Sequence, residues 1–214
     1  MRTLEEGLAA FEAENYREAF EILLPLAGEG ELVAQKHVAA MYNLGYGVER
    51  DLSKAAQWYR PVAEHGDPIA QNNLGMFLLE EDPKEAIKWL VAAAKQNIPF
   101  SQSTLADIYS GELQLSGLKE EDLLNNAEAL KLYMKAAKQN DPMASHRLGD
   151  MYATGQGVEK DEAEALKWYE KAAEEDYSTS QRLLAQAYQE GRLGLTPDPE
   201  KSKYWLSRAQ ANES

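Results

Sequence analysis

Residues 144–173 read ASHRLGDMYATGQGVEKDEAEALKWYEKAA, and residues 34–63 read AQKHVAAMYNLGYGVERDLSKAAQWYRPVA. The two stretches share Ala, Met-Tyr, Gly-x-Gly-Val, Asp, Trp-Tyr and a final Ala, each at the same offset from the first residue. A motif that recurs with a period of about 20–50 residues is typical of a repeat protein, in which each unit buries its apolar face against its neighbours. The sequence therefore predicts stacked repeats rather than a single closed core.

Weaker copies of this motif fill most of the remaining chain. The anchor of the first helix stands at Ala34, Ala70, Ser101, Ala144 and Ser180, and that of the second helix at Trp58, Trp89, Leu132, Trp168 and Tyr204. The two anchors of a repeat are thus 24, 19, 31, 24 and 24 residues apart, so repeat two lacks five residues and repeat three gains seven, within 110–126. We expect both changes to lie in the loop between the helices of a pair, where the stacking is undisturbed.

The apolar spacing within each repeat is helical. Ala144, Leu148, Met151 and Tyr152 fall at i, i+4, i+7 and i+8, whereas a strand would alternate with period two. Asp-Pro pairs at 67–68, 82–83, 141–142 and 198–199 are helix start signals, and Asp161 with Glu164 reads as a capping box. We predict an all-α solenoid of about six helix pairs in a single domain. Its predicted parts are a helix pair at 1–32, repeats at 33–68, 69–99, 100–142, 143–177 and 178–210, and a tail at 211–214.

Composition narrows the classes of function. The chain has no cysteine, which excludes disulfides and thiolate chemistry. Its 36 acidic against 22 basic residues give a net charge of −14, which repels nucleic acid and anionic membranes and attracts basic partners. The first residues are charged and no segment reaches membrane-spanning length, so we expect a cytoplasmic protein, or a periplasmic one if a signal peptide was removed.

The motif at 144–173 resembles the Sel1-like repeat, a relative of the tetratricopeptide repeat. The resemblance covers roughly residues 33–209, whereas residues 3–30 resemble only a generic tetratricopeptide-like helix pair. Repeats two and three lack the Gly-x-Gly-Val turn. It implies a right-handed superhelical scaffold that binds other proteins, with its first helices on the concave face. Some bacterial members are secreted, rich in cysteine and linked to β-lactams, but this chain lacks those cysteines.

No motif predicts catalysis, a metal or a cofactor. Ser116 and Lys119 match the Ser-x-x-Lys pattern of penicillin-recognising enzymes, but the Ser-Asp-Asn and Lys-Thr-Gly elements that should accompany it are absent. The two Gly-x-Gly motifs follow helices rather than strands, so they indicate turns instead of phosphate loops. The three histidines, His37, His65 and His146, stand at different offsets within their repeats and form no metal-ligand pattern. The tryptophans of the second helices are expected in the core.

A partner is expected to contact the first-helix positions two residues before and two after the core Leu position, which should point into the groove because the Leu and Tyr positions face the second helix. These positions vary from repeat to repeat, as either a recognition surface or neutral drift would produce. We also include Leu79, which with Asn72 and Met76 forms an apolar patch beside an amide. The predicted contact residues are Lys36, Ala40, Asn72, Met76, Leu79, Ser103, Asp107, His146, Asp150, Arg182 and Gln186.

Three functions follow from this sequence, and the first is favoured. The chain is a non-enzymatic scaffold or adaptor that holds a segment of another protein in its groove, with a basic partner suggested by the acidic surface. Alternatively, it is an immunity-type protein that neutralises a toxin by direct binding. By family analogy alone, it could be a β-lactam-interacting hydrolase. The apolar run 204–206 predicts a monomer or a weak homodimer through a terminus.

Overall fold

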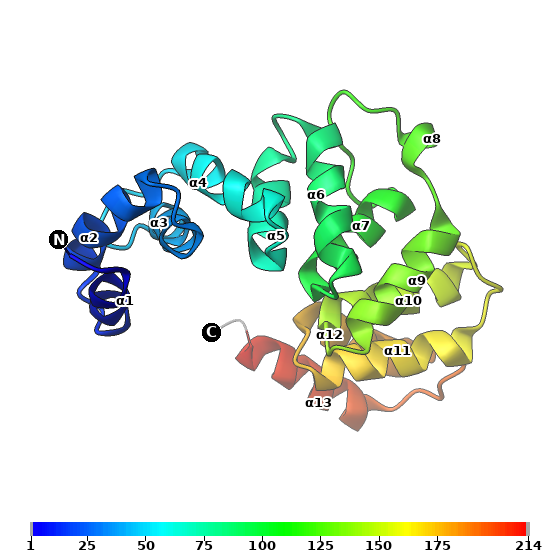
Figure 1. Cartoon of the computed structure of the whole chain (residues 1–214). Helices are drawn as coiled ribbons and strands as arrows, with labels where there is room; N and C mark the ends of the chain where they lie inside the picture. Colours follow the sequence, from blue (N-terminus) through cyan, green and yellow to red (C-terminus); the bar gives the residue numbers. More distant parts are fainter. Residues whose placement is uncertain (1, 213–214) are drawn as a thin grey trace. The chain divides into compact units, whose positions relative to one another are not determined.

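The computed structural model describes residues 2–212, without the side chains of residues 120 and 122, and every regular element in this part of the chain is a helix (Figure 1). The chain divides into two compact units, one ending at Ile98 and the other beginning at Pro99, and each is described by itself. The predicted single domain therefore stays a prediction. In the first unit, consecutive helices pack against one another. Its helices are α1 (Leu4–Glu12), α2 (Tyr16–Gly28), α3 (Leu32–Leu44), α4 (Leu52–Glu64), α5 (Pro68–Leu78) and α6 (Pro83–Lys95).

The second unit repeats this arrangement, with α7 packed on α9, α9 on α10, and so on to α13. The short helix α8 lies in the long connection between α7 and α9. The helices of this unit are α7 (Pro99–Ser110), α8 (Glu120–Leu123), α9 (Asn126–Ala137), α10 (Pro142–Thr154), α11 (Glu162–Glu174), α12 (Ser178–Glu190) and α13 (Pro199–Ala211). The prediction of an all-α solenoid built from helix pairs is confirmed.

The helices begin where the sequence predicts. Asp67 and Asp141 accept hydrogen bonds from backbone N–H groups of the first turn, and proline follows each as the first helical residue. Gly45 ends α3 in the left-handed region, at φ 74°, where a residue without Cβ has no steric cost. The capping box at Asp161 is only half formed: Asp161 accepts from Glu164 N, but the Glu164 carboxylate pairs with Lys167 Nζ at 2.7 Å.

Loops of different length are closed in the same way in every repeat. The N-cap residue of the second helix donates its backbone N–H to a carbonyl near the end of the first helix, at 2.7–2.9 Å in all five repeats. The pairs are Asp51 to Tyr42, Asp82 to Leu78, Asn125 to Tyr109, Asp161 to Tyr152 and Asp198 to Tyr188. The deletion in repeat two and the insertion in repeat three both lie between these fixed ends, as predicted.

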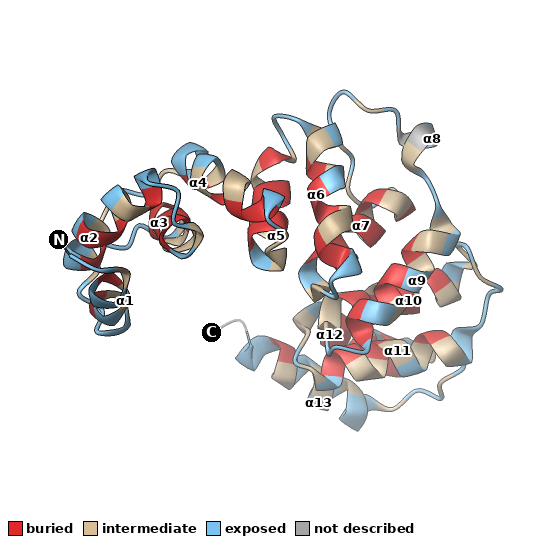
Figure 2. Cartoon of the chain, in the orientation of Figure 1, coloured by how far each residue is buried: buried red, intermediate tan, exposed pale blue. Residues whose placement is uncertain are grey.

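The core follows the repeated positions (Figure 2). The anchors Ala34, Ala70 and Ala144 are fully buried, as is the core residue Leu148. In α4, α9 and α11 the most buried aromatic residue is a tyrosine: Tyr59, Tyr133 and Tyr169 are each at most 3% exposed. The expectation that the tryptophans all lie in the core holds for Trp89, whereas Trp58 and Trp168 are only partly buried.

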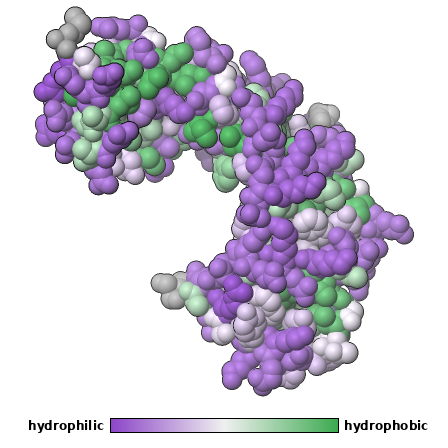
Figure 3. All heavy atoms as spheres, turned by 60° about the horizontal axis from the view of Figure 1, so that its bottom comes forward, coloured by the Kyte–Doolittle hydropathy of each residue, from purple (hydrophilic) through white to green (hydrophobic). Residues whose placement is uncertain are grey.

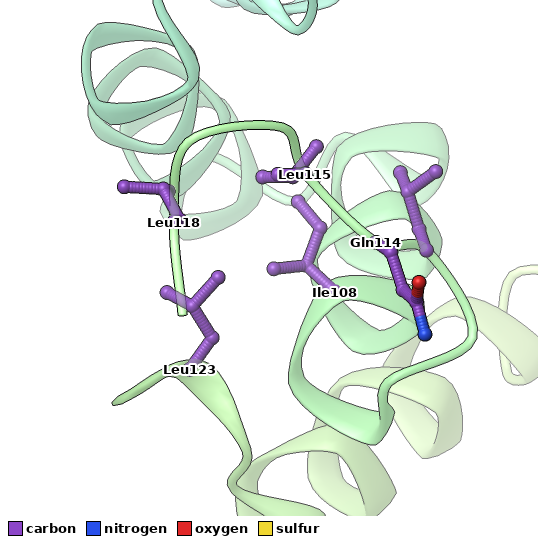
Figure 4. Close-up of a pocket in the computed structure, with 6 residues that line it drawn as sticks. Ile108, Gln114, Leu115, Leu118 and Leu123 are labelled. Carbon is purple, nitrogen blue, oxygen red and sulfur yellow. The ribbon is translucent and has the colours of Figure 1, made fainter. Parts of the chain in front are cut away.

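The insertion in repeat three packs on the end of α7. Leu115, Leu118 and Leu123 lie around Ile108 and, with Leu113 and Gln114, line a partly open cavity of about 190 Å³ (Figure 4). This volume is below the range of small-molecule pockets, about 300–1,000 Å³. The insertion is thus a partly packed segment that covers the end of α7.

Candidate functional site

In the first unit, two of the predicted contact residues, Lys36 and Asn72, form polar contacts with other residues of the chain. Lys36 Nζ lies 2.6 Å from Asp67 Oδ2, so Lys36 fastens α3 to the start of α5. Asn72 Nδ2 donates to Asn73 Oδ1 at 3.1 Å. Ala40 is half-buried, as are Met76 and Leu79. Lys36 therefore joins two neighbouring repeats, whereas the Asn72 hydrogen bond stays within α5.

Met76 and Leu79 line a groove of about 450 Å³ between the start of α4 and the end of α5. Leu52 at the start of α4, with 41% of its surface exposed, forms another apolar wall. Glu80 and Glu81, which are both exposed, close the groove with negative charge. Asn72 is not among the lining residues, so the predicted patch of Asn72, Met76 and Leu79 is replaced by one that Leu52 completes.

In the second unit, two of the predicted contact residues are buried. Ser103 has no exposed surface, and its hydroxyl bonds to Asp141 and to Pro99 O. His146 is 8% exposed and shares a hydrogen bond of 2.8 Å with the Ser180 hydroxyl. The prediction that these side chains face an open groove is wrong, because Ser103 bonds to the N-cap residue of α10 and His146 bonds to Ser180 of α12.

Asp107 and Asp150 occupy equivalent positions on α7 and α10, and each accepts a hydrogen bond from a buried tyrosine of its own repeat. Tyr133 Oη donates to Asp107 Oδ1 at 2.6 Å, and Tyr169 Oη donates to Asp150 Oδ1 at 2.8 Å. The two pairs join the first helix to the second at the same point in successive repeats. Each tyrosine bonds to Oδ1 only, so the other oxygen of each carboxylate is not used in these hydrogen bonds.

Arg147 links the two carboxylates. Its guanidinium lies 2.8 Å from Glu112 Oε2, 3.5 Å from Asp150 Oδ2 and 3.7 Å from Asp107 Oδ1. Its side chain is 29% exposed, so these ion pairs are shielded from water more than surface pairs are. The Arg147 cluster (Asp107, Glu112, Arg147 and Asp150) is a partly shielded polar surface with one cation among three anions.

Burial shifts the ionisation of several groups around this cluster. It raises the pKa of Asp107 above its ordinary value, although the Tyr133 hydrogen bond and the Arg147 charge act in the opposite direction. Burial also raises the pKa of Tyr133 and of Tyr169, and the adjacent carboxylates add to the effect. Both tyrosines therefore remain protonated hydrogen-bond donors at neutral pH.

Burial lowers the pKa of His146, and this effect exceeds the opposite influence of Asp150, whose Oδ2 lies 3.6 Å from His146 Nε2. The positive charge of Arg147 also lowers the pKa, whereas Glu112 raises it. Unfolded histidine takes up a proton near pH 6.5, before the buried ring does. Between that pH and the lower pKa of the folded state, the unfolded chain binds more protons, so the free energy of unfolding must fall as the pH falls.

We therefore expect acidification from pH 7.5 to 5.5 to destabilise the wild-type protein more than a His146→Gln variant, which keeps a polar side chain but does not titrate. Each unit by which the pKa is lowered contributes up to about 1.4 kcal/mol. Urea unfolding of both proteins across this pH range measures the difference. Equal pH dependence in the two proteins would show that His146 takes up its proton at the same pH in the folded and the unfolded chain, and would contradict the lowered pKa.

Beside the Arg147 cluster lies a second cavity, of about 330 Å³, lined by residues of α10, α11 and α12 and by the turn after α12. Ala153, Leu183, Ala187 and Leu193 give it an apolar surface. Arg182, Gln186, Arg192 and Tyr169 also line it, and none of its described lining residues is acidic. Arg182 and Gln186 were predicted as contact residues, and both are exposed. Although the chain has a net charge of −14, both charged residues described in this lining are arginines.

Leu193 at the rim of this cavity has a left-handed backbone, at φ 55°. A leucine in this region is strained by roughly 1 kcal/mol or more. It packs against the buried cluster that contains Tyr169 and Leu184, which holds it in place. The turn that carries Arg192 is therefore positioned by packing rather than by its own preference.

The two residues of the Ser-x-x-Lys match lie on the surface. Ser116 is exposed, and the Lys119 ammonium lies 3.7 Å from Glu121 on the surface. Within residues 2–212, no group of three or more His, Asp or Glu side chains is arranged to hold a metal ion. The helices described in this chain include none that is both long and apolar enough to cross a membrane. The face of the molecule in Figure 3 is largely hydrophilic, with hydrophobic groups in smaller patches.

Sequence reasoning missed Arg147, Glu112, Arg192 and Leu52. Arg147 directly precedes the core Leu148, and Glu112 lies in the insertion, so the motif predicted no role for either. Arg192 follows a helix-ending glycine, which is a signal for a turn but not for a cavity. In the apolar run 204–206, Tyr204 and Leu206 are exposed. Self-association through this run stays a prediction.

Comparison with solved structures supports this arrangement. A Sel1 repeat protein from Oxalobacter formigenes superposes with a TM-score of 0.82 at 31% identity, over 99% of this chain and 85% of that chain. The protective antigen c5321 of uropathogenic Escherichia coli gives 0.83 at 29% identity, over 99% and 45%. Immunity protein Pa5087 from Pseudomonas aeruginosa gives 0.57 at 20% identity, over 100% and 84%, a likeness that concerns the fold alone.

Curated relatives match over shorter stretches. An uncharacterized protein of Neisseria meningitidis, NMB1327, is 32% identical over 83 residues, which are 39% of this chain and 18% of that protein. The chain spans about a fifth of the length of the curated relatives that it matches. The Sel1 repeat itself matches at 32–67, 68–98, 106–141, 142–177 and 178–210, which is well over half of the chain. This protein therefore belongs to the Sel1 repeat family.

Proposed function

We propose that this protein is a non-enzymatic scaffold that binds a segment of another protein through the first-helix face of its second unit. Proteins with Sel1 repeats generally act in protein–protein interaction. The observation that carries the proposal is the cavity of about 330 Å³ lined by Arg182, Gln186 and Arg192 beside the Arg147 cluster. A partner segment would place an apolar side chain in the cavity and a carboxylate beside the arginines.

The surroundings of the cavity favour binding. Tyr169, which forms one wall, is 3% exposed and is held by its hydrogen bond to Asp150. A surface that is already ordered loses little conformational entropy when a partner binds. Arg192 lies 3.8 Å from Glu190 Oε2, and both side chains are well exposed. Such a loose surface pair is worth little, so a partner carboxylate can compete with Glu190 for Arg192.

The test combines cross-linking with a charge-reversed cavity. A photo-cross-linking amino acid at Gln186 should capture a partner in cells that naturally produce the protein, whereas the same group at the exposed Lys138 should not. The captured protein should bind an Arg182→Glu/Arg192→Glu variant at least tenfold more weakly than wild type in a direct titration.

The matched control is Arg17→Glu/Lys138→Glu, which changes the net charge by the same amount at exposed positions outside the cavity. It should keep wild-type affinity for the captured protein. Equal weakening of both variants would show that the loss of affinity comes from the overall charge of the protein and not from the cavity. Unchanged affinity of the cavity variant, with its fold intact, would reject the site.

A further inference from the structure

The Gly-x-Gly turn of an intact repeat covers the start of the preceding second helix. A Cβ atom on Gly47 would lie 2.4 Å from the carbonyl carbon of Tyr16, the first residue of α2. One on Gly157 would lie 2.7 Å from Cβ of Asn126, the first residue of α9. The glycines therefore allow the turns of repeats one and four to press directly onto equivalent positions of their neighbours.

The residue between the glycines completes the cover. The Tyr46 ring stacks on that of Tyr16, with centroids 4.3 Å apart and planes inclined by 14°. Gln156 Nε2 donates to Asn126 Oδ1 at 3.1 Å and to Ser110 O at 2.9 Å. The turn thus places an aromatic ring over Tyr16 in repeat one and an amide group over Asn126 in repeat four.

Repeat two has lost this cover. Leu52 is the first residue of α4 and corresponds to Tyr16 and Asn126, but only residues 79–81 connect α5 to the N-cap Asp82. The Asp82 N–H still bonds to Leu78 O at 2.8 Å, so the ends of the loop keep the usual geometry and only the covering residues are missing. Leu52 is left 41% exposed on the groove of about 450 Å³ described above.

We propose that this groove, the vacant turn site of repeat two, binds a segment of a partner protein that carries an aromatic side chain flanked by basic residues. The aromatic side chain would take the place that Tyr46 has over Tyr16, against Leu52, Met76 and Leu79. The basic residues would lie beside Glu80 and Glu81 at the edge of the groove.

Charge selects this occupant over a second copy of the chain. Each copy carries a net charge of −14, so two copies repel at long range, whereas a basic segment is attracted. The groove also differs from the cavity of the second unit, because its charged lining residues are acidic rather than basic. The inference extends the proposed function, since both concern binding of a protein segment, but it concerns other residues and the opposite charge.

The probe is a fluorescent peptide, Lys-Leu-Gly-Tyr-Gly-Val-Lys-Arg, which is the chain's own turn 43–50 with Asn43 and Glu49 changed to lysine. We expect it to bind the full chain and to shift the methyl NMR signals of Leu52, Met76 and Leu79. A peptide with alanine in place of tyrosine, and one with glutamate in place of both lysines, should each bind at least tenfold more weakly. Absence of binding, or signal shifts confined to other residues, would overturn the proposal.

The decisive variant fills the groove from within. Replacing residues 79–81 by the sequence of residues 43–50 restores the missing turn between ends that already have the required geometry. Peptide affinity should fall at least tenfold, and the unfolding temperature should rise because Leu52 becomes covered. A folded graft that binds the peptide as wild type does would reject the site.

Point variants test the groove independently of the graft. Leu52→Ser removes the apolar wall at an exposed helix start and should weaken peptide binding at least fivefold. Glu80→Gln/Glu81→Gln should weaken it several-fold and reduce its dependence on salt. The Arg182→Glu/Arg192→Glu variant should bind the peptide as wild type does, so the failure of one site leaves the other testable. Unchanged peptide binding in the Leu52 and glutamate variants would also overturn the proposal.

Discussion

Replacing Gly47 by alanine should lower the free energy of unfolding by about 3 kcal/mol. Gly47 has φ 68°, where alanine is disfavoured by roughly 1 kcal/mol. In addition, the new Cβ would lie 2.4–2.6 Å from backbone atoms of Tyr16 and Arg17. Backbone atoms cannot rotate away as a flexible side chain can, so the turn must lift from α2, and overpacking of this kind costs about 1–3 kcal/mol. Urea unfolding measures the loss.

The control for Gly47→Ala is Gly66→Ala in the same unit. Gly66 also has a positive φ, 92°, but a Cβ there would meet nothing within 4 Å. The free energy of unfolding of this variant should fall by about 1 kcal/mol, the cost of placing alanine at a positive φ. Similar losses in the two variants would mean that the turn of repeat one moves freely, and that the close approach to α2 contributes nothing to stability.

Arg147→Met should destabilise the protein by about 2 kcal/mol at neutral pH. Methionine retains an apolar side chain of similar length, but it leaves Asp107, Glu112 and Asp150 without the cation that lies among them. Loss of one partner from a fully buried ion pair costs about 3–5 kcal/mol, and the 29% exposure of Arg147 reduces this figure. Arg17→Met, at a side chain 87% exposed, should change stability by less than about 0.5 kcal/mol.

The pH dependence of Arg147→Met provides an internal check. Asp107 already has a raised pKa, and loss of the neighbouring positive charge raises it further. Above the pKa of the unfolded carboxyl, near 3.9, the folded variant then binds more protons than the unfolded chain. Its stability therefore rises relative to wild type as the pH falls toward that value. A deficit that stays constant from pH 7 to 5 would indicate lost packing rather than uncompensated charge.

The repeated motif was sufficient to predict the class of fold, the pairing of the helices, most helix starts and the positions of the loop changes. These features depend on contacts within one repeat or between neighbours, and the same residues recur at the same offsets to make them. Asp67 before Pro68 and Gly45 after α3 act within a single turn of helix, so their roles can be read locally.

The accessibility of each side chain depends instead on what the neighbouring repeat places over it. Ser103 and His146 occupy positions that the motif leaves variable, but Asp141, the N-cap of α10, and Ser180 of α12 bond to them where they are buried. Leu52 is exposed for the converse reason. Repeat two lacks a turn equivalent to those that cover Tyr16 and Asn126 in repeats one and four. Burial is a property of two elements in contact, and a motif read along one chain specifies only one of them at a time.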